Sequence, residues 1–171
     1  TLIATAVGTM AAVGIHGMKG KLRSAVMTLT NIPMTNPDIV TGVALALLFA
    51  FVGGALRRND ILSFWTLLIA HITFNLPYVI LSVMPKLRQM DKHLTEAALD
   101  LGCTPMQAFF KVELPSIMPG VISGLIMAFT LSLDDFVISY FTTGSGFETL
   151  PIRIYSMTKK RVTPDMYALS R

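Results

Sequence analysis

Hydrophobic positions along this chain fall into long uncharged runs rather than into stripes of helical or strand period. The runs cover residues 1–15, 38–56, 61–85 and 117–141, and only the last contains carboxylates in its interior. A membrane-spanning helix needs about 20 mainly apolar residues, and the three longer runs are close to that length. We therefore predict an all-α integral membrane protein, a helical transmembrane bundle with spans at these four positions.

Two prolines interrupt the long apolar stretch that precedes residue 56. A single helix over its 33 residues from 24 to 56 would be about 50 Å long, whereas the hydrocarbon core of a bilayer is about 30 Å thick. We expect Pro33 and Pro37 to break the stretch, so that a span begins near Asp38. Pro119 is expected in the first turn of the last span, where its missing N–H is tolerated.

The first apolar run begins without Met and is followed, not preceded, by basic residues. A signal peptide would carry its basic region before the apolar core. We interpret residues 1–15 as the end of a membrane helix whose beginning is missing. No apolar run follows Glu148, so a last span is expected to be missing too.

The composition agrees with a membrane protein and excludes several classes of function. The chain is 53% hydrophobic and 14% charged, whereas soluble domains average about 25% charged residues. The net charge of +4 is dispersed, which argues against nucleic-acid binding. The single cysteine, Cys103, has no partner for an internal disulfide and no neighbours at metal-ligand spacing. No phosphate-binding Gly-x-x-x-x-Gly-Lys-Ser/Thr loop occurs, so no ATP site, metal or cofactor is predicted in this chain.

Residues 86–115 form a polar segment between the third and fourth runs. They carry eight charges, four of each sign, and must lie in water. A short helix is predicted there, with Gly102 ending it in the left-handed conformation. Its apolar stripe has the spacing i, i+3, i+4 and i+7, and comprises Leu94, Ala97, Ala98 and Leu101.

A second short helix is predicted immediately after Gly102. The residues Thr104, Pro105, Met106 and Gln107 form a capping box with proline at the first helical position. Two short helices joined at a sharp bend make a compact knob. An amphipathic loop lying on the headgroups would show the same helix pattern, so the pattern alone leaves both interpretations open.

The spacing within residues 96–115, EAALDLGCTPMQAFFKVELP, resembles the EAA signature of permeases of ATP-binding-cassette importers. Only Val112, where the signature has Ile, departs from it. The resemblance implies that the loop is cytoplasmic and that its first helix contacts an ATPase subunit. The loops on the two sides carry equal numbers of Lys and Arg, so the resemblance alone assigns residues 86–115 to the inside and 142–165 to the outside. The implied ATPase-coupling residues are Glu96, Ala97, Ala98, Leu101, Gly102, Leu114 and Pro115.

The resemblance extends over nearly the whole chain. The segments PDIV, FWTLLIAHITFNLPYV, FTLSLDDFVIS, ETLPIRIYSM and TPDMYAL are similar to the C-type permease subunits of spermidine/putrescine importers. That family implies a type I importer permease fold, MetI-like, with six spans, of which this chain, a single domain over 1–171, would lack the first and last. It also implies a multi-pass protein of the bacterial inner membrane that is not itself an enzyme.

The same resemblance implies a set of partners. These are a homodimeric ATPase that binds ATP and Mg, a second permease subunit, an extracytoplasmic polyamine-binding protein and the membrane lipid. An importer of another small solute, such as an opine, a phosphonate or an amino-acid-like compound, is the alternative. An ion channel would not need a knob shaped for an ATPase.

Two adjacent carboxylates, Asp134 and Asp135, interrupt the last apolar run. A carboxylate at the centre of a lone membrane helix costs about 2.5–3.5 kcal/mol on insertion scales, and such residues usually mark a substrate path or a buried partner. In a continuous helix the two would face different directions, about 100° apart. We expect at least one to face a water-filled passage and to attract a polycation, and the other to bind a partner helix or the rim of the pore. An intramembrane aspartyl protease would instead need two carboxylates on different helices.

The family resemblance implies a substrate-path role for Asp38, Ser132, Asp134 and Asp135. For Asp38, beside Pro37, a helix N-cap is the alternative. The aromatic side chains of Phe136, Tyr140 and Phe141 would suit a polyamine through cation–π attraction. His71 is interpreted as a hydrogen-bonding residue between helices.

Overall fold

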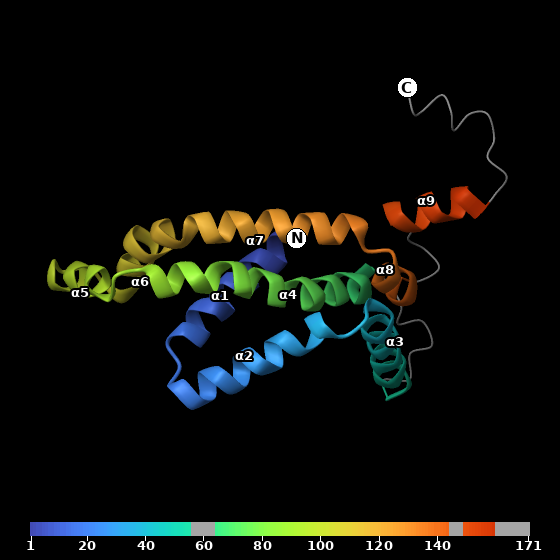
Figure 1. The fold of residues 1–171 in the computed structure, drawn as a ribbon, viewed down its shortest axis with the longest axis horizontal. Helices are drawn as coiled ribbons and strands as arrows, with labels where there is room; N and C mark the ends of the chain where they lie inside the picture. The colour runs from blue at the N-terminus through green and yellow to red at the C-terminus, as the bar shows by residue number, and fades with distance from the viewer. Residues whose placement is uncertain (56–63, 144–148, 160–171) are drawn as a thin grey trace, which may run out of the picture. The chain divides into compact units, whose positions relative to one another are not determined.

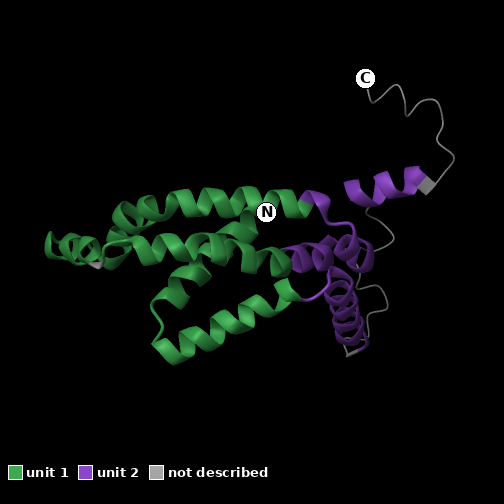
Figure 2. Ribbon diagram, viewed as in Figure 1, with its two compact units in different colours: residues 1–35, 72–132 green, residues 36–71, 133–171 purple. Residues whose placement is uncertain are grey.

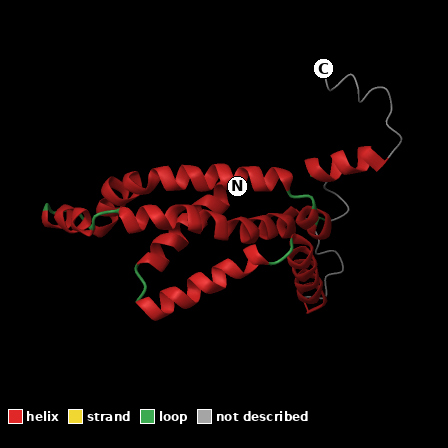
Figure 3. Cartoon of the chain, in the orientation of Figure 1, coloured by secondary structure: helices red, strands yellow, loops and turns green. Residues whose placement is uncertain are grey.

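The computed structural model describes residues 1–55, 64–143 and 149–159 (Figure 1). These residues form helices joined by short loops, and they contain no strand (Figure 3). The all-α prediction is confirmed. The elements are α1 (Leu2–His16), α2 (Gly20–Thr35), α3 (Asp38–Ala55), α4 (Phe64–Gln89), α5 (Lys92–Asp100), α6 (Pro105–Ala108), the π-helical segment η1 (Phe109–Glu113), α7 (Leu114–Asp134), α8 (Val137–Thr142) and α9 (Leu150–Lys159).

Two helical runs in the described part of the chain are long and apolar enough to cross a membrane. They are α4 and the continuous run Pro105–Asp134, and α2 with α3 adds a third if that pair is one interrupted span. Large apolar side chains on these helices face outward, with Phe51 77% and Ile126 60% exposed. Such exposure is unfavourable in water and ordinary in lipid. The four spans predicted from the sequence stay a prediction.

The chain divides into two compact units (Figure 2). The first unit comprises Thr1–Thr35 and Ile72–Ser132, and the second Asn36–His71 and Leu133–Arg171. The α4 helix contributes its last part to the first unit and its first part to the second. The predicted single permease domain stays a prediction.

The core of the first unit lies between the apolar faces of α1, α4 and α7. The α4 helix supplies a wide stripe at one-turn spacing, as a helix packed on two sides requires. The buried cluster comprises Ala12, Ile15, Val79, Ile80, Val83, Met84, Leu87, Ile117 and Ala128.

Glycines allow α1 and α7 to approach α4 closely. A Cβ atom built on Gly120 would lie 2.9 Å from the carbonyl oxygen of Ser82, and one on Gly8 would lie 2.7 Å from Cγ1 of Val79. Gly124, one turn after Gly120, also faces Val79, at 3.3 Å from its Cα. Small residues four apart are typical of tight helix packing in membranes, where van der Waals contact replaces the hydrophobic driving force.

Pro33 and Pro119 lie at other helix positions than the sequence predicted. Pro33 is inside α2, and the break comes at residues 36 and 37, so only Pro37 acts as a helix breaker. Pro119 is also inside its helix, because α7 begins at Leu114 rather than near 117. The wide π turns of η1 end two residues before Pro115, whose ring would clash with the carbonyl of Lys111 in a regular helix.

In the second unit, α3 packs against α8. A Cβ atom on Gly42 would lie 3.2 Å from the ring of Phe141 and 3.7 Å from Cα of Ile138, so the two backbones are close. The first part of α4 joins them, since the Thr66 hydroxyl donates to the carbonyl of Thr142 at 3.1 Å. The short helix α8 is therefore held from two sides.

Replacing Gly120 by Val should destabilise the protein by about 1–3 kcal/mol, because the added atoms would overlap the backbone of α4. Gly14→Ala is the matched control, since a Cβ there meets nothing within 4 Å. Thermal unfolding of the detergent-solubilised protein measures both. Equal midpoints for the two variants would contradict the close contact of α7 with α4.

Candidate functional site

The knob predicted between the third and fourth runs is present in the first unit. Its first helix, α5, begins at the N-cap Asp91, whose carboxylate accepts the His93 N–H at 3.0 Å. It ends in a Schellman motif: the Cys103 N–H donates to the Ala98 carbonyl and the Gly102 N–H to the Leu99 carbonyl, at 3.1 and 2.9 Å. Gly102 has φ 85°, which confirms its predicted left-handed conformation.

The second helix of the knob begins with the predicted capping box. The Gln107 N–H donates to the Thr104 hydroxyl at 3.3 Å, and the Thr104 N–H donates to the Gln107 side-chain oxygen at 3.1 Å. Pro105 takes the first helical position. This prediction is confirmed. The sequence did not reveal that the helix continues through η1 into α7.

A hydrogen bond between side chains closes the knob. The Thr95 hydroxyl donates to Oε1 of Glu113 at 3.0 Å and so joins α5 to η1. With both helix ends capped and the two helices tied together, the knob is a preformed element rather than a loose loop. Figure 1 shows α5 and α6 at one end of α4 and α7.

Most of the apolar stripe on α5 is exposed. Only Ala98 is buried, at 7% exposure, whereas Leu94 is 48% and Leu101 86% exposed. Met106 and Phe110, on α6 and η1, are 67% and 57% exposed. Among the other predicted coupling residues, Glu96, Ala97, Gly102 and Pro115 are exposed and Leu114 is half-buried.

The last apolar run is not one continuous helix. The structure ends α7 at Asp134 and begins α8 at Val137, so residues 117–141 do not form a single helix. The carboxylate of Asp135 explains the break, since it accepts the N–H groups of Ile138 and Ser139 at 3.1 and 3.2 Å. These are donors that have no partner within α8 itself. Asp135 therefore lies outside α7, and the predicted angle of about 100° between the two aspartates, which assumed a continuous helix, does not apply.

His71, on α4, also contacts Asp135. Its Nε2 lies 3.5 Å from Oδ2 of Asp135 and 3.5 Å from the Ser139 hydroxyl, while Nδ1 lies 3.0 Å from the Leu67 carbonyl. The side chains of His71 and Asp135 are 14% and 7% exposed. In the tautomer that carries its proton on Nδ1, His71 donates to the Leu67 carbonyl. His71 is thus a hydrogen-bonding residue between helices, as interpreted from the sequence.

Asp134 lies in a contrasting environment. It is exposed and is the last residue of α7. In the described part of the chain, no hydrogen bond or ion pair joins its carboxylate. The carbonyl end of a helix already carries a partial negative charge of about half a unit, so a carboxylate there concentrates negative charge and attracts cations.

The other two predicted path residues lie close to this break or in the second unit. Asp38 is exposed and is the first residue of α3, so it is a helical residue rather than the N-cap. Its charge is favourable at the positive end of that helix. Ser132 is half-buried and lies in α7, two residues before Asp134.

A hollow with aromatic walls follows the break in the second unit. It has a volume of about 310 Å³ and is lined by Ile39, Phe136, Val137, Tyr140, Phe141 and Tyr155. The ring of Phe136 lies 4.5 Å from that of Tyr155 and 5.6 Å from that of Tyr140. Because Ile39 follows Asp38 and Phe136 follows Asp135, the chain joins this hollow directly to acidic residues.

A protein family matches residues 4–164 of the chain. It is described as the binding-protein-dependent transport system inner membrane component. The chain belongs to this family. The prediction that the chain is an importer permease of the inner membrane is confirmed at the level of the family.

Several curated relatives match the chain over most of its length. The spermidine/putrescine transport system permease protein PotC of Haemophilus influenzae is 41% identical over 168 residues, which cover 98% of this chain and 63% of the relative. PotC of Escherichia coli K12 is 40% identical over 167 residues, 98% of this chain and 61% of the relative.

The putrescine transport system permease protein PotI of Escherichia coli K12 is 43% identical over 138 residues, 81% of this chain and 49% of the relative. The chain thus spans less than two thirds of the length of these curated relatives. All three are named as transport permeases rather than as enzymes.

Sequence reasoning missed part of the second-unit site. Tyr155 belongs to a mixed segment without apolar periodicity, so nothing in the pattern assigned it to an aromatic wall. The pairing of His71 with Asp135 joins residues 64 positions apart and left no local signal. The segment TPDMYAL, which carries part of the family resemblance, lies outside the described residues.

Asp135→Ala should lower stability by about 1–2 kcal/mol, because the two N–H groups at the start of α8 lose their acceptor. The neighbouring Asp134→Ala makes the same change of charge at an exposed position and should have little effect. Thermal unfolding of the purified protein distinguishes them. A larger loss for the Asp134 variant would refute the assignment of the cap to Asp135.

Proposed function

We propose that this chain forms part of the translocation path of an ATP-binding-cassette importer for polyamines. The observation that carries the proposal is the combination of an exposed carboxylate, Asp134, with an aromatic hollow a few residues further along the chain. The names of the relatives, which specify spermidine and putrescine, support the same substrate class.

The chemistry of the second-unit site suits a flexible polycation. A polyamine alternates ammonium groups with short aliphatic segments. The ammonium groups are attracted by the carboxylates of Asp38 and Asp134, and the faces of Phe136, Tyr140 and Tyr155 favour cations through their ring quadrupole. The volume of about 310 Å³ is at the low end of the range of roughly 300–1,000 Å³ for ligand pockets.

The two aspartates have different roles in this proposal. Asp135 holds α8 in place and is occupied by hydrogen bonds to the backbone. Asp134 remains available to the substrate. Because Tyr140 and Tyr155 are 58% and 44% exposed, the attraction is partly screened by water. Moderate affinity is what a path requires, since a site that binds too tightly blocks release.

Other solutes of binding-protein-dependent importers fit this site less well. Phosphonates and opines carry anionic groups, and the exposed carboxylates Asp38 and Asp134 would repel them. An amino-acid-like compound has an ammonium group, but its own carboxylate would meet the same repulsion. The polyamine interpretation is therefore preferred to this alternative.

Energy would enter through the knob formed by α5, α6 and η1. Its exposed apolar residues are available to a partner, and the segment is too polar to lie in lipid. We assign this surface to a separate ATPase dimer that binds ATP and Mg. Closure of that dimer would move the knob and open the bundle toward an extracytoplasmic binding protein, with a second permease subunit completing the path.

Asp134→Asn should raise the half-saturating polyamine concentration about 1.4- to fivefold, since an exposed charge pair contributes about 0.2–1 kcal/mol. Uptake of labelled spermidine and putrescine, in cells lacking their own uptake system, measures the effect. Asp134→Glu keeps the charge and should retain transport. Unchanged uptake by the Asn variant, at equal membrane abundance, would count against a path role.

Leu101→Ser should weaken binding of the ATPase subunit. Leu101 is 86% exposed, so the change leaves the knob folded but removes an apolar contact of about 1.5–3 kcal/mol if that side chain is buried by the partner. Co-purification of the ATPase with the membrane subunits is the measurement. Leu22→Ser, at a 57% exposed leucine of α2, is the matched control and should not weaken it. Equal recovery with both variants would contradict the docking surface.

A further inference from the structure

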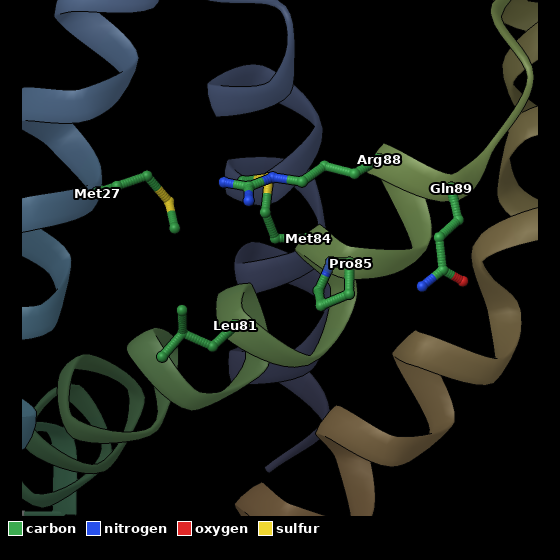
Figure 4. Close-up of a pocket in the computed structure, with 6 residues that line it drawn as sticks. All are labelled: Met27, Leu81, Met84, Pro85, Arg88 and Gln89. Atoms are coloured by element: carbon green, nitrogen blue, oxygen red, sulfur yellow. The ribbon is translucent and has the colours of Figure 1, made fainter.

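A second hollow lies in the first unit, between α2 and α4 (Figure 4). It has a volume of about 260 Å³ and is lined by Met27, Leu81, Met84, Pro85, Arg88 and Gln89. Neither the knob nor the aromatic hollow includes any of these residues. Its lining combines an apolar wall with a guanidinium group, so its ligand must have both an apolar part and an anionic part.

The lining residues of α4 follow one another along a single face of the helix. Leu81, Met84, Pro85 and Arg88 have the spacing i, i+3, i+4 and i+7. The apolar residues come first, and Arg88 is the residue before the helix ends at Gln89. From Leu81 to Arg88 the face extends about 10 Å along the axis. Figure 4 shows the Arg88 side chain extending along Met84 toward Met27.

The α2 helix repeats this order of apolar and basic residues. Arg23 and Met27 are one turn apart, and Arg23 is nearer the polar end of the helix, which begins at Gly20. Nη2 of Arg23 lies 3.6 Å from the sulfur of Met84. Arg23 and Arg88 therefore both border Met84, one from each helix.

These two guanidinium groups have no carboxylate partner in the part of the chain that the structure describes. Further positive charge lies close by in the sequence, at Lys19 and Lys86. Unpaired cations of one sign around one hollow repel each other, and a bound anion would relieve that repulsion. The described residues thus supply no negative charge to balance the two arginines.

The depth of the hollow indicates the source of the anion. The α4 helix ends one residue after Arg88, and the polar α5 follows. In a bilayer that α4 crosses, this end of the helix lies at the level of lipid headgroups. The apolar lining lies deeper, at the level of acyl chains. Basic pockets between membrane helices on the cytoplasmic side are suited to anionic headgroups.

We propose that this hollow binds an anionic phospholipid of the cytoplasmic leaflet. Its phosphate lies between Arg23 and Arg88, where guanidinium groups make charge-assisted hydrogen bonds. Its acyl chain lies along Met27, Leu81 and Pro85. An acidic protein segment would satisfy the arginines but leave the apolar wall without a partner, whereas a phospholipid covers both.

The choice of leaflet rests on the proposed function, because it follows from the cytoplasmic assignment of the knob. The lipid site itself does not rest on the proposed function. Binding is measured without transport. A transporter that binds the lipid but does not carry polyamines would refute only the proposed substrate, and a polyamine transporter without this lipid would refute only the site.

The test is native mass spectrometry of the full transporter complex, titrated with phosphatidylglycerol or phosphatidylcholine. Wild type should retain phosphatidylglycerol in preference to phosphatidylcholine. Arg23→Gln and Arg88→Gln should each lower phosphatidylglycerol affinity about fivefold, and the double variant about 25-fold. Lys21→Gln is the matched control, because it removes one charge from the same helix outside the hollow, and it should change the affinity little.

Three results would overturn the proposal. They are equal retention of the two lipids by wild type, an equal loss in the Lys21 variant, and full displacement of the lipid by inorganic phosphate, which would indicate an anion site without acyl recognition. If the arginine variants cannot be isolated, Met27→Trp narrows the apolar part and leaves both charges. Unchanged phosphatidylglycerol binding by that variant would overturn the proposal equally.

Discussion

The interaction on which the candidate site depends is the pair of hydrogen bonds that the Asp135 carboxylate accepts at the start of α8. A helix that begins inside an apolar segment exposes N–H groups that neither lipid nor the helix itself can satisfy. Asp135 supplies the acceptor and so permits the chain to stop one helix and begin another. The break in turn leaves Asp134 at the carbonyl end of α7. Two adjacent residues of the same type therefore differ: Asp135 accepts hydrogen bonds from the backbone, whereas Asp134 is exposed.

The knob must likewise satisfy the backbone N–H and C=O groups at its helix ends. The end of α5 is closed by the Schellman motif at Gly102, and the start of α6 by the capping box of Thr104 and Gln107. With its backbone groups satisfied locally, the knob does not need its apolar side chains for its own stability. Leu101 and Met106 can therefore stay exposed. Both sites thus follow from how the chain treats its helix ends.

This explains how much could be predicted from the sequence. Helix caps depend on residues a few positions apart, so Gly102 and the Thr104 box were predicted correctly, and hydropathy was enough for the all-α membrane fold. The break after Asp134 was missed because its apolar flanks also suit a continuous helix. The side chain of Asp135 decides between the two, through bonds that no periodicity reveals. Pairings across the chain, such as His71 with Asp135, were outside the reach of local patterns.

The continuous helical run Pro105–Asp134 connects the knob with the exposed carboxylate of Asp134. It begins in the knob, passes through the π turns that accommodate Pro115, and ends at the exposed carboxylate. A helix of 30 residues is about 45 Å long. Glycines at 120 and 124 pack it against α4 without bulky side chains between, so a displacement of the knob would be shared by both helices. One uninterrupted helical backbone therefore joins the knob to Asp134, with no loop between them.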